Sequence, residues 1–409
     1  MKDKKHIMII AGEPSGDLHG ANLIKELINR NKANGVDDSF ANHQSLTITG
    51  IGGDLMEDAG MRLFFHIKEL SAMGVTEVLK QFKQIKQAFD LFRKKITLEK
   101  PDLLILIDYP GFNLKAAEYA KKNKIKVLYY ITPKVWAWNS SRLKKIKKYV
   151  DHAAIIFPFE QTIFKKAEIP AIYVGNPLLD CYREVKREKE LSKSPNNSDL
   201  LPPLTIGLLP GSRESEIANL LEIMLQSAII INNLAKSVIN NLNNIRFIVS
   251  AASSVNINKF NKILEPYNQV NINTQGDNIF EVVRGDPTEI FRRSDFLIAT
   301  SGTVTLEAAI CGVPMVIIYK TSPFTYFLAK KFVKIPYIGL PNIVANCPIV
   351  PELLQNDATP EKIAKHVLSM LNPEKLASTK KRLLMMKRYL GDAGAAERTA
   401  KLAIKMLES

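Results

Sequence analysis

Cysteine is scarce in this sequence, with only three residues among 409, at Cys181, Cys311 and Cys347. None of them stands in a C-x-x-C spacing, which argues against a disulfide framework and a zinc finger and suits a reducing compartment. Asp-x-Asp motifs are absent, and the six histidines show no metal-ligand spacing. We therefore expect neither a metal nor another cofactor.

Hydrophobic runs are short throughout the chain. No stretch approaches the roughly 20 apolar residues needed to cross a bilayer. The basic N-terminus leads into a brief apolar run that stops at Gly12, too early for a signal-peptide core. These absences predict a cytoplasmic protein whose membrane contact is peripheral.

Positive charge is what the sequence has in excess: 56 Lys and Arg residues against 41 Asp and Glu, a net charge of +15. A basic surface attracts phosphate, whether on nucleic acid, lipid head groups or small substrates. The basic residues are scattered and no nucleic-acid-binding module is recognisable, so we expect no nucleic-acid partner.

Apolar runs alternate with amphipathic stretches in both halves, which is typical of parallel sheets with helices on both faces. A length of 409 residues allows two domains. We expect an α/β protein with a first domain over residues 1–182, a polar linker over 183–203, a second domain over 204–372 and a helical tail over 373–409 that packs toward the first. The predicted strands are 6–11, 46–50, 103–108, 127–131, 153–157 and 171–174, then 204–209, 246–251, 296–300 and 315–319.

Two glycine-bearing turns in the second domain, PGSR at 210–213 and TSGT at 300–303, each stand where a strand should meet a helix. Backbone N–H groups at a helix start bind phosphate, because they lack helical partners and the helix dipole favours an anion. Glu307 lies one helical turn beyond the second turn, where it is placed to grip a sugar. The two turns together suggest a nucleoside diphosphate carrying a sugar. The glycine-rich turn at 11–18 lacks the G-x-G-x-x-G fingerprint, so NAD binding is not predicted.

Motifs along nearly the whole length carry a resemblance to one family. They are AGEPSGD at 11–17, IDYPGFN at 107–113, PKVWAW at 133–138, FPFE at 157–160, VGNP at 174–177, LPGSR at 209–213, TSGTVTLE at 300–307 and LPN at 340–342. In this order they resemble the bacterial lipid-A-disaccharide synthases, which are glycosyltransferases with two Rossmann-like domains (GT-B architecture). The resemblance implies a cleft between the domains and a C-terminal helix that crosses back to the first.

The reaction implied by this resemblance is an inverting glycosyl transfer. UDP-2,3-diacylglucosamine is the donor and 2,3-diacylglucosamine 1-phosphate is the acceptor, giving the β-1,6-linked lipid A disaccharide 1-phosphate and UDP. The enzyme would work peripherally on the phospholipid of the inner face of the cytoplasmic membrane. Another UDP-sugar enzyme on this scaffold, such as a polyprenyl-linked sugar transferase or a UDP-sugar 2-epimerase, is the alternative. The oligomeric state is not predicted.

An inverting transfer needs one group that takes the proton of the attacking hydroxyl. Asp108 ends an apolar strand at the carboxyl edge, where open α/β sheets hold ligands, although an aspartate at this position can also simply cap the next turn. The resemblance makes Asp108 the first choice for the base. Glu13 and Asp17 are the other candidates, and Ser15 beside them is either a helix cap or a substrate contact.

The leaving UDP needs fixed donors for its phosphates, and we assign Arg213 to this role because a guanidinium suits bidentate phosphate contact. A surface arginine paired with Glu214 or Glu216 is the alternative. Glu307 would bind the ribose hydroxyls. The other predicted substrate contacts are Gly211, Ser212, Thr300, Ser301, Gly302, Thr303 and, from the resemblance, Asn342.

An apolar stripe at helical spacing is a candidate membrane face for acylated substrates. Lysines flank it, which favours contact with anionic lipid. A core-facing helix is the more common interpretation of such a pattern and stays open. The stripe comprises Val75, Val78, Leu79, Phe82, Ile85 and Phe89, and basic residues also cluster between Arg142 and Lys148.

Overall fold

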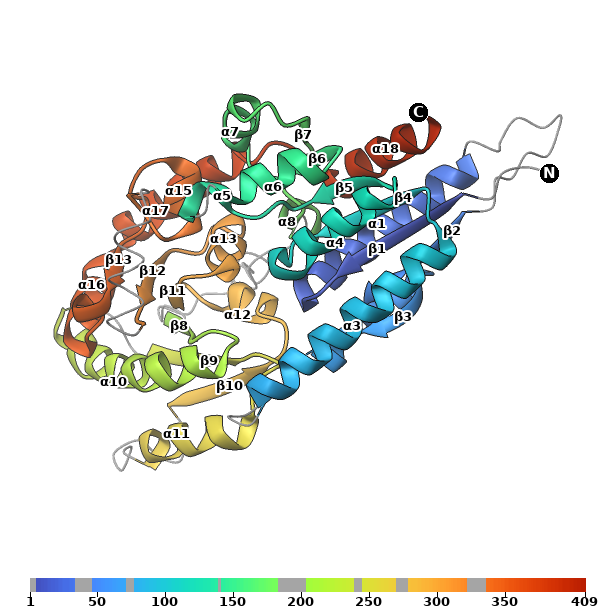
Figure 1. Ribbon diagram of the computed structural model, residues 1–409. Coiled ribbons are helices and arrows are strands. Elements are labelled where there is room, and N and C mark those ends of the chain that lie inside the picture. The colour runs from blue at the N-terminus through green and yellow to red at the C-terminus, as the bar shows by residue number, and fades with distance from the viewer. Residues whose placement is uncertain are drawn as a thin grey trace. The chain divides into compact units, whose positions relative to one another are not determined.

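A computed structural model describes residues 5–33, 46–70, 77–138, 141–182, 204–238, 245–269, 279–321 and 336–409. They form two compact units: unit 1 comprises Met1–Asp180 with Leu390–Ser409, and unit 2 comprises Cys181–Tyr389. Each unit is built on a parallel sheet with helices packed against it (Figure 1), which confirms the predicted fold class. The predicted linker over 183–203 lies outside the described residues.

The sheet of unit 1 has seven strands in the order β3-β2-β1-β4-β5-β6-β7. Every pair of neighbours is parallel, so all strand ends that precede a helix meet at one edge. The strands are β1 His6–Ala11, β2 Thr47–Gly52, β3 Arg62–His66, β4 Leu103–Ile107, β5 Lys126–Tyr130, β6 His152–Ile155 and β7 Ala171–Tyr173.

Helices cover both faces of this sheet, and the strands are apolar on both sides for that reason. In β1, Ile7 and Ile9 join the core under α1 and α18, whereas Met8 and Ile10 join the core under α3 and α4. The helices of this unit are α1 Pro14–Ala33, α2 Asp54–Asp58, α3 Glu77–Glu99, α4 Pro110–Lys122, α5 Val135–Trp138, α6 Ser141–Tyr149, α7 Glu160–Lys166 and α18 Ala395–Glu408, with α8 Leu178–Cys181 at the unit boundary.

Unit 2 repeats this plan with six parallel strands in the order β10-β9-β8-β11-β12-β13. They are β8 Leu204–Leu209, β9 Ile245–Ala251, β10 Phe280–Arg284, β11 Phe296–Thr300, β12 Met315–Tyr319 and β13 Glu352–Leu354. The described helices are α10 Glu214–Val238, α11 Ile257–Gln269, α12 Thr288–Arg293, α13 Thr303–Ile310, α15 Leu340–Ala345, α16 Pro360–Met370 and α17 Pro373–Arg388. Helices α10, α11 and α16 share one hydrophobic core over the sheet.

Three strands that the sequence did not predict lie at sheet edges: β3, β10 and β13. An edge strand has a neighbour on one side only and is short or partly exposed, so it lacks a continuous apolar run. In β3 only Phe65 is buried, and β13 has three residues.

Helix α10 is long and apolar enough, over Glu214–Ala235, to cross a membrane by length and composition alone. The prediction that no stretch approaches this length is therefore wrong. Leu221, Met224 and Leu225 of α10 are fully buried in the core of unit 2, and the helix packs against α16. A core helix passes the same test as a membrane span because both are apolar on most sides.

The predicted tail over 373–409 is divided between the units, so its boundary needs correction. Helix α17 packs on α13 and α15 within unit 2, where Leu383 and Met386 are buried. Only the part from Leu390 onward belongs to unit 1, where α18 packs on α1. Asp180 accepts hydrogen bonds from the backbone N–H groups of Gly394 and Ala395 and thereby caps α18.

Candidate functional site

The carboxyl edge of unit 1 brings Glu13 and Asp108 together. Strand order reverses between β1 and β4, which pair in a register that sets Ala11 beside Ile107. Glu13 follows β1 by two residues and Asp108 follows β4 directly. Ligands of open α/β sheets bind at such a reversal point, so the structure places two of the predicted catalytic carboxylates where a ligand is expected.

The backbone at Asp108 is strained. Asp108 and Tyr109 both have a φ of 45°, the left-handed region that non-glycine residues avoid at a cost of about 1–3 kcal/mol each. The Asp108 carbonyl oxygen accepts hydrogen bonds from the Tyr129 hydroxyl and the Asn113 side-chain amide, both at 2.8 Å. These bonds stabilise the turn, and β4 therefore ends at Ile107, one residue earlier than predicted.

The Asp108 carboxyl group has a raised pKa of about 6. Burial is the main cause and the negative charge of Glu13 the second, while Lys134 and Arg142 act in the opposite direction. A carboxylate of this pKa is mostly ionised at neutral pH and is a better proton acceptor than an ordinary aspartate.

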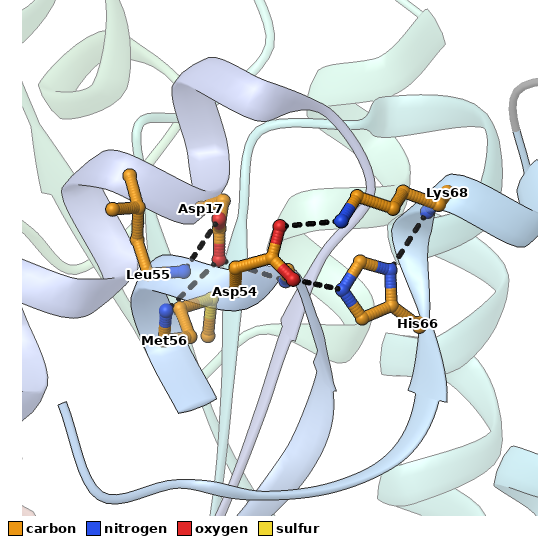
Figure 2. A network of polar contacts seen from close by, with 7 residues as sticks. Asp17, Asp54, Leu55, Met56, His66 and Lys68 are labelled. Carbon is orange, nitrogen blue, oxygen red and sulfur yellow. Dashed lines mark hydrogen bonds and ion pairs between the residues drawn. The ribbon is translucent and has the colours of Figure 1, made fainter. Parts of the chain in front are cut away.

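Asp17 has a structural role that the sequence did not reveal. Its carboxylate accepts hydrogen bonds from the backbone N–H groups of Gly53 (2.7 Å), Leu55 (3.2 Å) and Met56 (3.1 Å), at the start of α2. Figure 2 shows the Asp17 carboxylate facing Leu55 and Met56. Both oxygens of this buried carboxylate are taken up by backbone donors, so we withdraw Asp17 from the catalytic candidates.

Ser15 and Glu13 are exposed. Helix α1 begins at Pro14, so Ser15 is its second residue and not the residue that caps it. The expected loop at 11–18 is thus mostly helix, because proline is well suited to the first helical position.

A second polar group lies beside Asp17, and sequence reasoning missed it. Asp54 contacts Lys68 at 2.7 Å and His66 at 3.2 Å, and the Lys68 backbone N–H donates to His66 Nδ1 (Figure 2). The Lys68 ammonium is the main cause of the lowered pKa of the exposed Asp54 carboxyl. This network ties the end of β3 to the start of α2.

The first predicted phosphate turn of unit 2 already holds an anion, the side chain of Glu216. Its carboxylate accepts the backbone N–H groups of Ser212 (3.1 Å) and Arg213 (3.3 Å) and pairs with the Arg213 guanidinium at 3.2 Å. Gly211 is favoured here because other residues rarely adopt its φ of 111°, and because a Cβ would lie 2.8 Å from Glu216 Cβ. The donors converge on a carboxylate of the chain itself, and Arg213 pairs with Glu216, the alternative that the sequence left open. A glutamate at the third position of a helix, as in a capping box, could have indicated this contact.

The second turn is uncapped within the described residues. Gly302 precedes α13 without a side-chain cap there, and a Cβ on it would meet no described atom within 4 Å. Thr303 is exposed, and the buried Thr300 hydroxyl has no hydrogen-bond partner among the described residues. Ser301 donates its hydroxyl to the Ile338 carbonyl at 3.2 Å. Because β8 and β11 are neighbours at the strand-order reversal of unit 2, both turns lie at one ligand-binding edge.

Glu307 lies on α13, one helical turn beyond Thr303. Burial raises the pKa of its carboxyl to about 7, a hydrogen bond from Tyr182 lowers it, and the charge of Asp286 raises it. The Tyr182 ring packs on Phe291 with ring centres 6.0 Å apart. No local pattern in the sequence indicated Tyr182 as a partner of Glu307.

Asn342 is a structural residue. Its side-chain amide donates to the Val350 carbonyl and to Glu352, both at 2.8 Å, and its oxygen accepts the backbone N–H groups of Ile349 (2.8 Å) and Val350 (3.1 Å). The side chain is fully buried. All its strong hydrogen-bonding capacity is used within unit 2, which corrects the predicted substrate contact.

The structure describes the side chains of two residues of the predicted membrane stripe. Ile85 and Phe89 pack against the core of unit 1, and the Phe89 ring centre lies 5.2 Å from that of Phe112. These two residues follow the alternative that the sequence left open, a core-facing helix. Val75 and the side chains of Val78, Leu79 and Phe82 lie outside the described residues.

Within the described part of the chain, no group of three or more His, Cys, Asp or Glu side chains is placed to hold a metal ion.

The family model described as lipid-A-disaccharide synthetase matches residues 7–406. The chain belongs to the lipid-A-disaccharide synthase family. It is therefore a glycosyltransferase that forms the lipid A disaccharide, and its family implies a UDP-sugar donor and a phosphosugar acceptor.

Curated relatives agree with this assignment. The chain is 39% identical over 368 residues to the lipid-A-disaccharide synthase of Coxiella burnetii (strain CbuK_Q154), covering 90% of this chain and 89% of the relative. It is 38% identical over 404 residues to the lipid-A-disaccharide synthase of Geobacter sulfurreducens, covering 98% of this chain and 97% of the relative.

Solved structures resemble this synthase family member in fold. A UDP-GlcNAc 2-epimerase from Neisseria meningitidis bound to UDP-GlcNAc matches with a TM-score of 0.61 at 13% identity, covering 98% of this chain and 100% of the other. MurG from Acinetobacter baumannii matches with a TM-score of 0.58 at 14% identity, covering 98% and 99%. At such low identity the likeness shows the GT-B fold alone. The family match and the curated relatives do not favour the epimerase alternative.

Replacing Asp17 with alanine tests its structural role. We expect the free energy of unfolding of unit 1 to fall by about 2 kcal/mol, because buried backbone donors at the start of α2 lose their acceptor. Urea denaturation measures this, with the exposed Asp58→Ala on the same helix as control. Equal losses in both variants, or a hundredfold loss of kcat in folded D17A, would contradict the structural assignment.

Replacing Glu216 with glutamine tests the internal anion. We expect UDP to bind about threefold more tightly at neutral pH, because the substitution removes a carboxylate that competes for the same donors. Calorimetric titration with UDP gives the affinity. Glu214→Gln is the matched control, since Glu214 pairs instead with Lys259 at 3.1 Å. Weaker binding in E216Q alone would mean that Glu216 holds Arg213 in place for the nucleotide.

Proposed function

We propose that unit 1 binds the acceptor, with Asp108 as general base, and that unit 2 binds the UDP-sugar donor. The observation that carries the first assignment is the position of Asp108 beside Glu13 at the reversal point of the sheet, with a pKa raised to about 6. The pair of anion-binding turns at the reversal point of the other sheet supports the second.

The chemistry is a single displacement. The 6-hydroxyl of 2,3-diacylglucosamine 1-phosphate attacks the anomeric carbon of UDP-2,3-diacylglucosamine while its proton passes to the Asp108 carboxylate. The bond between the anomeric carbon and the phosphate oxygen breaks, UDP leaves with the bonding electrons, and the configuration inverts. No covalent enzyme intermediate is needed, so one base is sufficient.

Glu13 has a supporting part in this proposal. Its negative charge raises the pKa of Asp108 and thereby strengthens the base. Because Glu13 and Ser15 are exposed at the same edge, they are placed to contact acceptor hydroxyl groups.

The leaving UDP is stabilised by fixed donors. We assign the β-phosphate to Arg213 and to the backbone N–H groups of Ser212 and Arg213, which already converge on the Glu216 carboxylate. The start of α13, with Ser301 to Thr303, is the second phosphate contact, and Glu307 accepts the ribose hydroxyls. We expect turnover to persist with EDTA present.

Membrane association belongs to the proposal as well. The described part of α6 presents four exposed lysines, which suit the negative surface of anionic phospholipid. They are Lys144, Lys145, Lys147 and Lys148. An enzyme of diacylated substrates gains from resting on the cytoplasmic face of the membrane that holds them.

The pH dependence of turnover tests the base. We expect kcat/KM to fall as the pH drops through about 6, because Asp108 accepts the proton only while ionised. Asp108→Asn should lower kcat at least about a hundredfold. Glu13→Gln removes a charge that raises the pKa of Asp108, so its acidic limb should move to lower pH with kcat near pH 8 changed by less than about threefold.

Disaccharide formation from both purified substrates provides the rates for these variants. If E13Q loses as much activity as D108N, Glu13 is the base. If D108N keeps the wild-type rate, Asp108 is not the base and the pH profile has another cause.

Binding to lipid vesicles tests the membrane assignment. The double variant Lys144→Glu and Lys145→Glu should bind vesicles rich in phosphatidylglycerol at least about tenfold more weakly at low salt, since each surface lysine contributes about 1 kcal/mol. The same charge change at the exposed Lys362 and Lys365 of α16 is the control. Equal effects of the two double variants would show that net charge alone governs binding.

A further inference from the structure

Glu160 is a buried carboxylate that the proposed chemistry does not use. It is the first residue of α7, directly beyond β6, and 1% of it is exposed. Burial raises the pKa of its carboxyl to about 7. Burying a carboxyl group is costly unless its oxygens are hydrogen-bonded, so the contacts of Glu160 indicate what it is for.

Those contacts fix one aromatic side chain. Glu160 Oε1 accepts the indole N–H of Trp136 at 3.1 Å. Glu160 Oε2 accepts the backbone N–H groups of Ile156 (3.2 Å) and Phe157 (3.0 Å), which hold the carboxylate itself in place. One oxygen therefore anchors the glutamate to the end of β6, and the other orients the indole.

Two phenylalanine rings pack against the same indole. Trp136 packs edge-to-face on Phe157 and Phe159, with ring centres 6.1 Å and 5.3 Å apart and an angle of 86° in each case. Trp136 is nonetheless only half-buried. A large ring that is hydrogen-bonded at its N–H and packed against two other rings, yet partly exposed, is pre-organised to receive a ligand on its exposed part.

The position of Trp136 relates it to Asp108. It lies in α5, just beyond β5, and β5 is the neighbour of β4 in a register that sets Tyr130 beside Ile107. Lys134, two residues before Trp136, lowers the pKa of both the Asp108 and the Glu160 carboxyl groups through its charge. Lys134 is thus within electrostatic range of the candidate base and of the carboxylate that orients the indole.

We propose that the exposed part of the Trp136 indole binds the sugar ring of the phosphorylated acceptor, and that Glu160 is the positioning residue that orients the indole. An indole presents a flat apolar surface to the C–H face of a pyranose, and its packing is directional. The Lys134 ammonium supplies a point charge suited to the acceptor phosphate. The assignment to the acceptor rests on the proposed function, in which the donor phosphates bind to unit 2.

Fluorescence isolates Trp136, because the chain has only two tryptophans. In a Trp138→Phe variant every tryptophan signal comes from Trp136. We expect diacylglucosamine 1-phosphate to change its emission in a saturable way and UDP to leave it unchanged. Absence of any response to the acceptor in a variant that still forms disaccharide would overturn the proposal and leave the synthase activity intact.

Kinetics test the positioning role. Glu160→Gln replaces one acceptor oxygen by an amide that cannot accept the N–H groups facing it, so we expect the KM for the acceptor to rise about tenfold with little change in kcat or in the KM for the donor. In the W138F background, E160Q should also shift the Trp136 emission. The control is the same substitution at the exposed Glu168, two residues beyond the end of α7.

Trp136→Ala provides an independent variant should E160Q fail to fold. It should raise the acceptor KM by at least about tenfold, whereas Trp136→Phe, which keeps a ring but loses the N–H, should have a smaller effect. Equal changes of the donor KM, the acceptor KM and kcat in these variants would mean that Trp136 and Glu160 only support the fold. This result would contradict the proposal. Wild-type protein that binds the acceptor but forms no disaccharide would instead overturn the proposed function.

Discussion

The pairing of β1 with β4 is the constraint on which the candidate site depends. It sets Ala11 beside Ile107, and the two turns that follow must then share very little space. A Cβ on Gly12 would lie 2.2 Å from the Tyr109 ring, so only glycine fits there. The left-handed Asp108–Tyr109 turn, held by Tyr129 and Asn113, directs the chain from the sheet into α4 and leaves the Asp108 carboxylate beside Glu13.

The two units share the same sheet architecture but differ in the charge at the edge where the strand order reverses. In unit 1 the reversal point holds two carboxylates, and burial together with the charge of Glu13 raises the pKa of Asp108, which suits proton transfer. In unit 2 the corresponding edge holds two helix starts, which suit phosphate. Glu216 occupies one of these helix starts, and the other has no side-chain cap among the described residues. In the proposed function the nucleotide therefore competes with a carboxylate at α10 but not at α13.

The hydrogen bonds in the structure separate the predicted site residues into those with a structural role and those that stay candidates for binding or catalysis. Asp17 and Asn342 have side chains that could bind substrate and belong to the predicted motifs. Their oxygen atoms, however, accept hydrogen bonds from backbone N–H groups of the protein itself. Asp108, Arg213 and Glu307 kept positions suited to their predicted roles, which remain proposals. Ile85 and Phe89 fit a membrane stripe and a core stripe equally well by spacing, and only packing distinguishes the two.

The sequence by itself determined the buried strands, because burial on both faces demands a continuous apolar run that is visible in one dimension. It also determined the family, through motifs spread along the chain. The tertiary structure alone decided the edge strands β3, β10 and β13, the separation of α17 from α18, and the partners of Asp17, Glu216 and Glu160. Sheet order, tertiary hydrogen bonds and burial depend on residues that are distant in the chain. Local sequence patterns therefore cannot predict them.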